Sequence, residues 1–62
     1  MTTIICQVNG KIRTHLLVKD NIEDVILLDM VKKHKDITPF INGKHIVKEI
    51  LVKNKLVNLV VS

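Results

Sequence analysis

Two stretches near the start of the chain alternate between apolar and polar residues around a turn signal. Residues 2–8 and 11–19 are rich in Ile, Val, Leu and Thr, and three of these four residue types favour β-strands. The Asn9-Gly10 pair between them tolerates the positive φ angles of a tight hairpin turn. The pattern therefore predicts a β-hairpin over residues 2–19.

The distribution of apolar side chains over the two faces favours one register of this hairpin. A two-residue loop would pair Val8 with Lys11 and so mix apolar and charged side chains on one face. A three-residue loop or a β-bulge pairs Val8 with Ile12 instead and gathers the apolar residues on one side, as a half-buried sheet requires. The other pairs of this register are Cys6 with Thr14 and Ile4 with Leu16. We expect this register, which leaves on the opposite face Gln7, Arg13 and His15.

The end of the chain repeats the arrangement around Lys53-Asn54. Residues 44–52 and 55–61 are rich in β-formers, so they predict a second hairpin. Both of its faces carry several aliphatic side chains, and we expect one face to pack on a helix while the other forms an exposed patch. The pairs expected from a two-residue loop are Leu51 with Leu56, Ile50 with Val57, Val47 with Val60 and Ile46 with Val61.

Residues 21–35, between the hairpins, have the features of a capped helix. The Asp20 carboxylate can accept a hydrogen bond from an early backbone N–H, and Glu23, three residues on, can reach back to Asp20. Acidic residues near the start and basic residues near the end suit the helix dipole. Apolar residues surround much of the helix, so we expect either deep packing or a partner on one flank.

A second, short helical turn is predicted directly after this helix. Ile37, Phe40 and Ile41 are spaced by one turn and are expected to plug one end of the core. Pro39 fits only near the start of such a turn, and Asn42-Gly43 favours its end. The order ββαββ predicts a small α+β fold in which two β-hairpins pack with one main helix.

Length and charge narrow the function. The 62 residues allow one domain, residues 1–62, with a thin core. The formal net charge of +4 favours a polyanionic partner. Phe40 is the only aromatic residue, so the chain lacks the stacking side chains with which proteins bind single-stranded nucleic acid. A nucleic-acid partner is therefore expected to be a folded RNA, recognised through its backbone and shape.

No residue pattern indicates catalysis. Cys6 is the only cysteine and lies in an apolar run, which predicts a core residue. The glycines are isolated, and the histidines with Cys6 lack metal-ligand spacing, so we expect no catalytic, cofactor or metal site. No stretch has the length of a membrane span or the features of a signal peptide. We expect a cytoplasmic chain with no membrane partner and no small-molecule substrate.

Several of these segments together resemble a known family. They are the run Gln7-Val8-Asn9-Gly10-Lys11-Ile12-Arg13, the helix, the segment Phe40 to Lys44, and the ending Ile50 to Val61 with its Lys55-Leu56-Val57-Asn58-Leu59-Val60-Val61. In this order they resemble the extreme C-terminal domain of bacterial-type leucyl-tRNA synthetase, over nearly the whole chain. The chain departs from the family at Lys53, where Pro is common, and at Thr14-His15.

The resemblance implies that this chain is a non-catalytic part of a larger enzyme. The chain would be a fragment of a larger multidomain synthetase that joins leucine to tRNA-Leu using ATP and Mg²⁺. This domain would contact the tRNA corner, hold no catalytic residue and partner the remainder of the synthetase chain. By motif match the expected tRNA-binding residues are Asn9, Lys11 and Arg13. Position and charge add Lys53, Asn54 and Lys55, with Lys32, Lys33 and Lys35 as weaker candidates.

The aliphatic character of the second hairpin supports an alternative. An exposed apolar face is typical of contact surfaces between proteins. The chain would then be a protein-interaction or dimerisation module that uses this face, and its association would be insensitive to salt.

Overall fold

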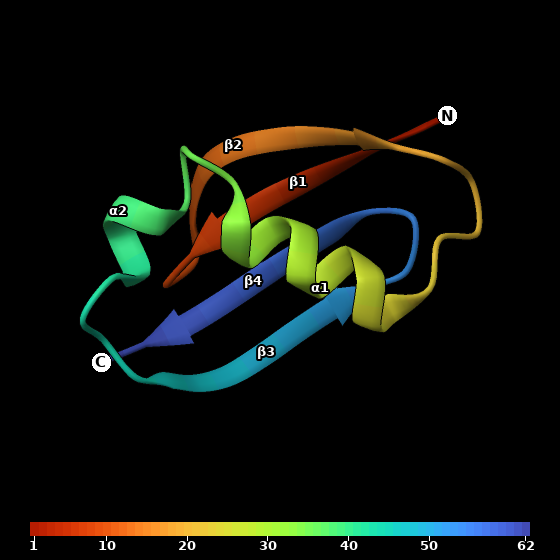
Figure 1. The fold of residues 1–62 in the computed structure, drawn as a ribbon. Coiled ribbons are helices and arrows are strands. Elements are labelled where there is room, and N and C mark those ends of the chain that lie inside the picture. The colour runs from red at the N-terminus through yellow and green to blue at the C-terminus, as the bar shows by residue number, and fades with distance from the viewer.

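In the computed structural model, which describes residues 1–62, four strands form one sheet and two helices lie on one of its faces (Figure 1). The predicted α+β class is confirmed, with one main helix between two hairpins. No helix has the length and hydropathy needed to cross a bilayer. The elements are β1 (Thr2–Val8), β2 (Lys11–Val18), α1 (Asp24–Lys33), α2 (Thr38–Ile41), β3 (Ile46–Val52) and β4 (Leu56–Val61).

The two hairpins join through their inner strands. The strand order is β2-β1-β4-β3, and β1 and β4 run parallel, with Ile5 opposite Leu56 and Val8 opposite Leu59. Because these two central strands point the same way, the turn that follows β1 lies at the end of β4. The turn that precedes β4 lies at the other end of the sheet (Figure 1).

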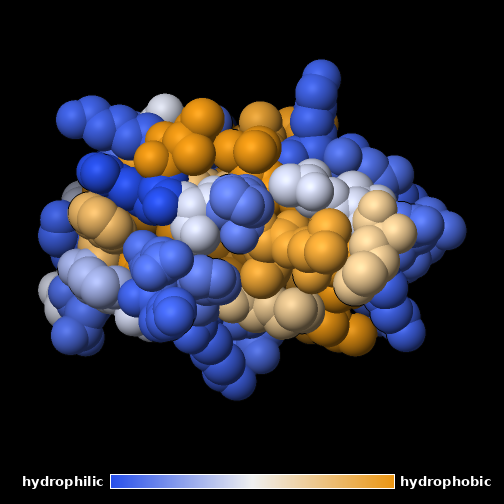
Figure 2. Space-filling model, turned by 90° about the horizontal axis from the view of Figure 1, so that it is seen from above, coloured by the Kyte–Doolittle hydropathy of each residue, from blue (hydrophilic) through white to orange (hydrophobic).

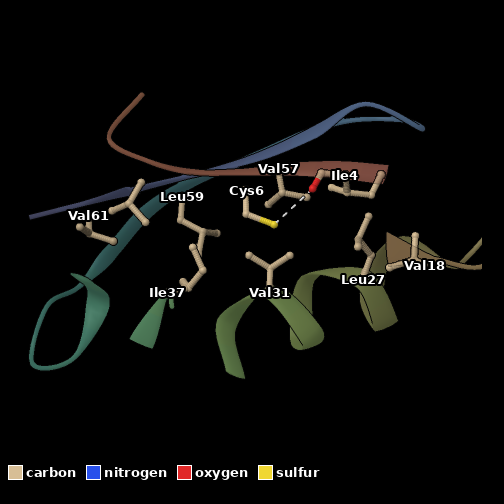
Figure 3. Packing of buried hydrophobic residues seen from close by; sticks show 10 residues of the cluster. Ile4, Cys6, Val18, Leu27, Val31, Ile37, Val57, Leu59 and Val61 are labelled. Atoms are coloured by element: carbon tan, nitrogen blue, oxygen red, sulfur yellow. Dashed lines mark hydrogen bonds between the residues drawn. The ribbon is translucent and has the colours of Figure 1, made fainter. Parts of the chain in front are cut away.

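A single apolar cluster lies between the sheet and the helices. In Figure 3 the side chains of the central strands point toward the helices, and Leu27, Val31 and Ile37 point back toward the sheet. On α1, Leu27 and Val31 are one turn apart and form the buried stripe of that helix. No polar or charged residue is buried. The ten buried residues are Ile4, Cys6, Val8, Val18, Leu27, Val31, Ile37, Val57, Leu59 and Val61.

The first hairpin combines a two-residue turn with a β-bulge. Val8 pairs with Lys11, so the expected pairing of Val8 with Ile12 is wrong. Arg13 is then an extra residue in β2, opposite the junction of Cys6 and Gln7. Beyond the bulge, the expected pairs of Cys6 with Thr14 and Ile4 with Leu16 are confirmed. The bulge reconciles the turn that Asn9-Gly10 favours with the register that the apolar face requires.

The register expected for the second hairpin is wrong next to the turn. Val52 pairs with Leu56 across a three-residue loop in which Asn54 has a φ of +60°. The Lys55 N–H donates to the Val52 carbonyl (3.0 Å). A shift between Ile46 and Lys48 then restores the expected pairing of Ile46 with Val61.

This register also corrects the expected faces of the second hairpin. Val57 lies beside Cys6 of β1 and faces the helices, and its partner on β3 is Leu51, which packs against the core. Leu51 was expected on the opposite face from Val57. The residues of this hairpin on the open face of the sheet include Ile50, Val52, Leu56 and Val60.

The start of α1 differs from the expected capped helix. The helix spans Asp24–Lys33, and Glu23 precedes it without a side-chain capping bond. The Asp20 carboxylate accepts instead from the Thr2 hydroxyl (2.6 Å), so the expected capping box is wrong. This bond, with the nearby terminal ammonium, holds the pKa of Asp20 below its usual value. A contact between segments distant in sequence has taken the carboxylate away from the helix.

The short turn after α1 is confirmed. Pro39 lies in the first turn of α2, where its missing N–H costs nothing. Ile37 is fully buried, and Phe40 and Ile41 pack against the core, as expected. Gly43 follows with a φ of +75°, which suits a glycine at the end of a helical turn.

Candidate nucleic-acid interface

The predicted binding residues lie at opposite ends of the sheet. Asn9, Lys11 and Arg13 are beside the first turn, at the same end as α2 (Figure 1). Lys53-Asn54-Lys55 forms the second turn, which is separated from the first by the length of β4, about 20 Å for its 6 residues. The structure therefore divides the six residues into two groups. We call the end that holds the first group the α2 end.

Hydrogen bonds from β4 hold the first turn in place. The Asn9 side-chain oxygen accepts from the Val61 N–H (2.8 Å), and the Asn58 side-chain oxygen accepts from the Gly10 N–H (3.0 Å). The Asn9 N–H donates to the Leu59 carbonyl (2.9 Å). Asn9 has a φ of +53°, a left-handed conformation that Asn adopts more readily than most residues. Asn9 thus positions the turn, and its side-chain oxygen is already occupied.

The sequence predicted Arg13 on the same face as Gln7 and His15. In the structure it lies instead on the helix side of the sheet. Its guanidinium carbon is 4.0 Å from the centre of the Phe40 ring on α2. The two-residue turn is the reason, because it pairs Val8 with Lys11 and so puts Lys11 and Arg13 on the face of the buried Val8. Lys11 and Arg13 are both exposed, and neither is in an ion pair.

Tertiary contacts bring more cations to the α2 end. The Thr14 hydroxyl of β2 donates to the Asp36 carboxylate (3.3 Å), which places Lys35 near the first hairpin. The Lys44 N–H donates to the Ile41 carbonyl at the end of α2 (3.0 Å). Among the side chains here, four cations meet one carboxylate, Asp36, which gives a net charge of +3 with His neutral. The four cations are Lys11, Arg13, Lys35 and Lys44.

Sequence reasoning missed Lys44 and Phe40 as members of this group. Both belong to a segment that is distant in sequence from the first hairpin. No local signal links them to Arg13, because only the packing of α2 beside β2 brings them together. Lys35 was a weaker candidate and lies at this end.

The opposite end has no such excess of charge among its side chains. The Lys55 carbonyl accepts from the Ile5 N–H (2.9 Å), which ties the second turn to β1. Three lysine side chains at this end, Lys19, Lys53 and Lys55, are offset in number by three carboxylate side chains, and the terminal ammonium of Met1 lies 3.4 Å from one of these, Asp20. These carboxylates belong to Asp20, Glu23 and Asp24 around the start of α1. Of the two weaker candidates on α1, Lys32 is in an ion pair with Glu49, and Lys33 is 3.0 Å from the Asp29 carboxylate.

The thiol of Cys6 is a core group, as expected. It is fully buried and lies 3.7 Å from the Ile4 carbonyl. Burial raises the pKa of the Cys6 thiol, which keeps it protonated and unreactive. No three His, Cys, Asp or Glu side chains are grouped so that they could hold a metal ion.

Apolar side chains are also exposed on the surface. Figure 2, which views the molecule from above Figure 1, shows apolar patches between hydrophilic side chains. On β2, Ile12 and Leu17 are 65% and 56% exposed. A hollow between β2 and α1 is lined largely by aliphatic residues, among them Leu17, Ile22 and Met30.

The fold and the surface define a small basic α+β domain suited to binding a polyanion. The search of protein-family models found no match. Curated relatives do match, each called leucine–tRNA ligase. The relative from Leptospira biflexa is 48% identical over 60 residues, and that from Ruthia magnifica is 47% identical over 58. The relative from Caldanaerobacter subterraneus is 40% identical over 62 residues. These alignments cover 94 to 100% of this chain but only 7 to 8% of the relatives.

A solved structure has the same fold. It is a ternary complex of the Agrobacterium radiobacter K84 agnB2 LeuRS with tRNA and LeuAMS, and it superposes with a TM-score of 0.94. The match covers 98% of this chain and 8% of that one at 21% identity. By its sequence relatives, this chain belongs to the leucyl-tRNA synthetase family and corresponds to a small part of those enzymes.

Proposed function

We propose that this chain is the C-terminal tRNA-binding domain of a leucyl-tRNA synthetase in the cytoplasm. It holds tRNA-Leu while the remainder of the synthetase performs the ATP- and Mg²⁺-dependent leucylation. The observation that carries the proposal is the concentration of unpaired positive charge at the α2 end. Four cationic side chains come together there from β2, the α1–α2 connection and the segment after α2, while at the opposite end three lysine side chains are offset in number by three carboxylate side chains.

Charge and shape both support a folded RNA as the partner. Lys and Arg that lack carboxylate partners are free to contact phosphate oxygens. The first turn is held by three hydrogen bonds to β4, so its cations are presented from a rigid support. The structural neighbour was solved in complex with tRNA, which agrees with this partner.

Kinetics of the full-length synthetase test the proposal. We expect Lys11→Ala/Arg13→Ala to raise the KM for tRNA-Leu more than the KM for leucine or ATP. The reason is that the domain contacts only the tRNA. The matched control is Lys53→Ala/Lys55→Ala, which removes the same charge at the opposite end of the sheet. Unchanged tRNA binding in the first variant would contradict the proposal.

Titration of the isolated chain provides a second test. The affinity for tRNA should fall by roughly one log unit per log unit of salt for each phosphate neutralised. The Lys11/Arg13 variant should show a smaller salt slope than the Lys53/Lys55 variant. An equal loss in both variants would indicate non-specific attraction to the net charge. An unrelated tRNA, titrated in parallel, measures the preference for tRNA-Leu.

The exposed apolar residues support a second candidate function, that of a protein-interaction module. Ile12 and Val52 lie on the open face of the sheet, which neither helix covers. Light scattering separates the two functions. A dimer that persists at high salt, together with absent RNA binding, favours the interaction module. A monomer with salt-sensitive RNA binding favours the tRNA-binding domain.

A further inference from the structure

We infer that Phe40 is a positioning residue that holds the Arg13 guanidinium ready to bind one phosphate of the RNA backbone. This inference deepens the proposed function and rests on it. It concerns a pair of residues, one on β2 and one on α2, that are 27 positions apart in the sequence.

The two-residue turn places Arg13 on the helix side of the sheet. It pairs Val8 with Lys11 and Gln7 with Ile12, so Lys11 and, two residues further on, Arg13 lie on the face of the buried Val8. On this side α2 begins one residue after the buried Ile37. The β-bulge at Arg13 then returns Thr14 to the position opposite Cys6.

The ring of Phe40 restricts the side chain of Arg13. Phe40 packs against the apolar core, so its ring is a fixed surface. The guanidinium carbon of Arg13 lies 4.0 Å from the ring centre, within the range of a cation–π contact. A long side chain that is otherwise free to rotate is thereby restricted before any ligand binds, which lowers the entropy cost of binding.

The N–H donors of Arg13 have no partner within the protein. The guanidinium makes no hydrogen bond within the protein and is in no ion pair. Asp36, the one acidic side chain of the α2 end, accepts a hydrogen bond from Thr14 instead. The guanidinium lies over the Phe40 ring, and because Arg13 is exposed its N–H donors remain available. A planar fork of donors in a positively charged region matches the geometry of a phosphodiester.

A double-mutant cycle tests this inference in the chain as it is. The affinity for a fluorescently labelled tRNA-Leu transcript is measured by anisotropy over a series of salt concentrations. We expect Phe40→Leu to weaken binding by about two- to fivefold, the amount that a partly exposed cation–π contact supports. The salt slope should not change, since no charge is lost. Arg13→Ala should lower the slope by about one. In the Arg13→Ala background, Phe40→Leu should have no further effect.

Two variants separate positioning from general packing. Phe40→Tyr keeps the ring and should bind within about twofold of the wild type. Leu51→Val loosens the same core from β3, far from Arg13, and should leave tRNA affinity unchanged. Circular dichroism checks that each variant is folded. If Phe40→Leu is unfolded, Phe40→Met replaces it, because the flexible Met side chain fills irregular space.

The possible results are distinct. An equal loss from Phe40→Leu in both backgrounds would overturn the inference, since Phe40 would then act through the fold alone. An unchanged salt slope in Arg13→Ala would also overturn it, because the guanidinium would be stacking on a base and not binding a phosphate. If the wild type and the Lys11/Arg13 variant bind tRNA equally, the proposed function itself fails.

Discussion

Substitutions at Asn9 can separate what its backbone conformation and its side-chain hydrogen bond each contribute to the stability of the fold. Asn9 has a left-handed backbone, and its side-chain oxygen accepts from the Val61 N–H at 2.8 Å. Replacement by Gly keeps the backbone relaxed but leaves this N–H without its acceptor. A partly buried donor that loses its partner costs about 1 kcal/mol or more. Replacement by Ala adds the penalty of a left-handed backbone, about 1 kcal/mol.

The expected order of stability is therefore wild type and Asn9→Asp, then Asn9→Gly, then Asn9→Ala. Asp keeps an acceptor oxygen in place and tolerates the left-handed conformation. Urea unfolding of the chain, monitored by circular dichroism, measures the differences in free energy of unfolding. We expect the dependence of this free energy on urea concentration to have the same slope in all variants. For a chain of this size, 1 kcal/mol corresponds to about 4 to 8 °C in Tm.

Asn54 is the matched control for this series. It has a φ of +60°, close to the +53° of Asn9, but its side chain makes no hydrogen bond in the structure. Asn54→Ala should cost only the backbone penalty, and Asn54→Gly should be neutral within about 0.5 kcal/mol. If Asn9→Gly proves as harmless as Asn54→Gly, the bond to Val61 contributes nothing and the reasoning is refuted.

Two further predictions concern the core and the N-terminal strand. Val31→Ala should destabilise the fold by about 1 to 3 kcal/mol, because Val31 is fully buried, whereas Val25→Ala, at a position 76% exposed on the same helix, should stay within about 0.5 kcal/mol. Equal effects in urea unfolding would contradict the packing described for α1. Thr2→Val removes the hydroxyl that lowers the pKa of Asp20. A lowered pKa stabilises the fold above the ordinary carboxyl pKa, and this contribution disappears as the pH falls through the folded value. The wild type should therefore have a higher free energy of unfolding than Thr2→Val near neutral pH, and this difference should vanish in strong acid. A difference that does not depend on pH would argue against this linkage.

Local sequence signals were sufficient for most of the elements. The dipeptide Asn9-Gly10 makes a tight turn, and Pro39 lies in the first turn of α2, because each acts on its own backbone. The alternation in the first hairpin correctly indicated the pairing of Cys6 with Thr14. It also indicated that a bulge was one way to reach that register, but not that the bulge would fall at Arg13.

The sequence was less informative where a side chain or a strand has more than one possible partner. Asp20 has the chemistry of a helix cap, yet its carboxylate binds Thr2, a residue 18 positions earlier. The register of the second hairpin depends on which residues reach the core beside β1. Val57 and Leu59 must both lie next to Cys6 and Val8, which shifts the pairing by one residue at the turn.

The amino-acid sequence alone determined the strands, the helix, the basic charge and the absence of stacking aromatics apart from Phe40, since these follow from composition and short-range periodicity. The tertiary structure decided where the charges lie. Burying β1 and β4 side by side in parallel sends the two turns to opposite ends of the sheet. The packing of α2 on the core brings Phe40 to Arg13. Both outcomes depend on contacts between residues that are far apart in the chain, and such contacts have no local signature.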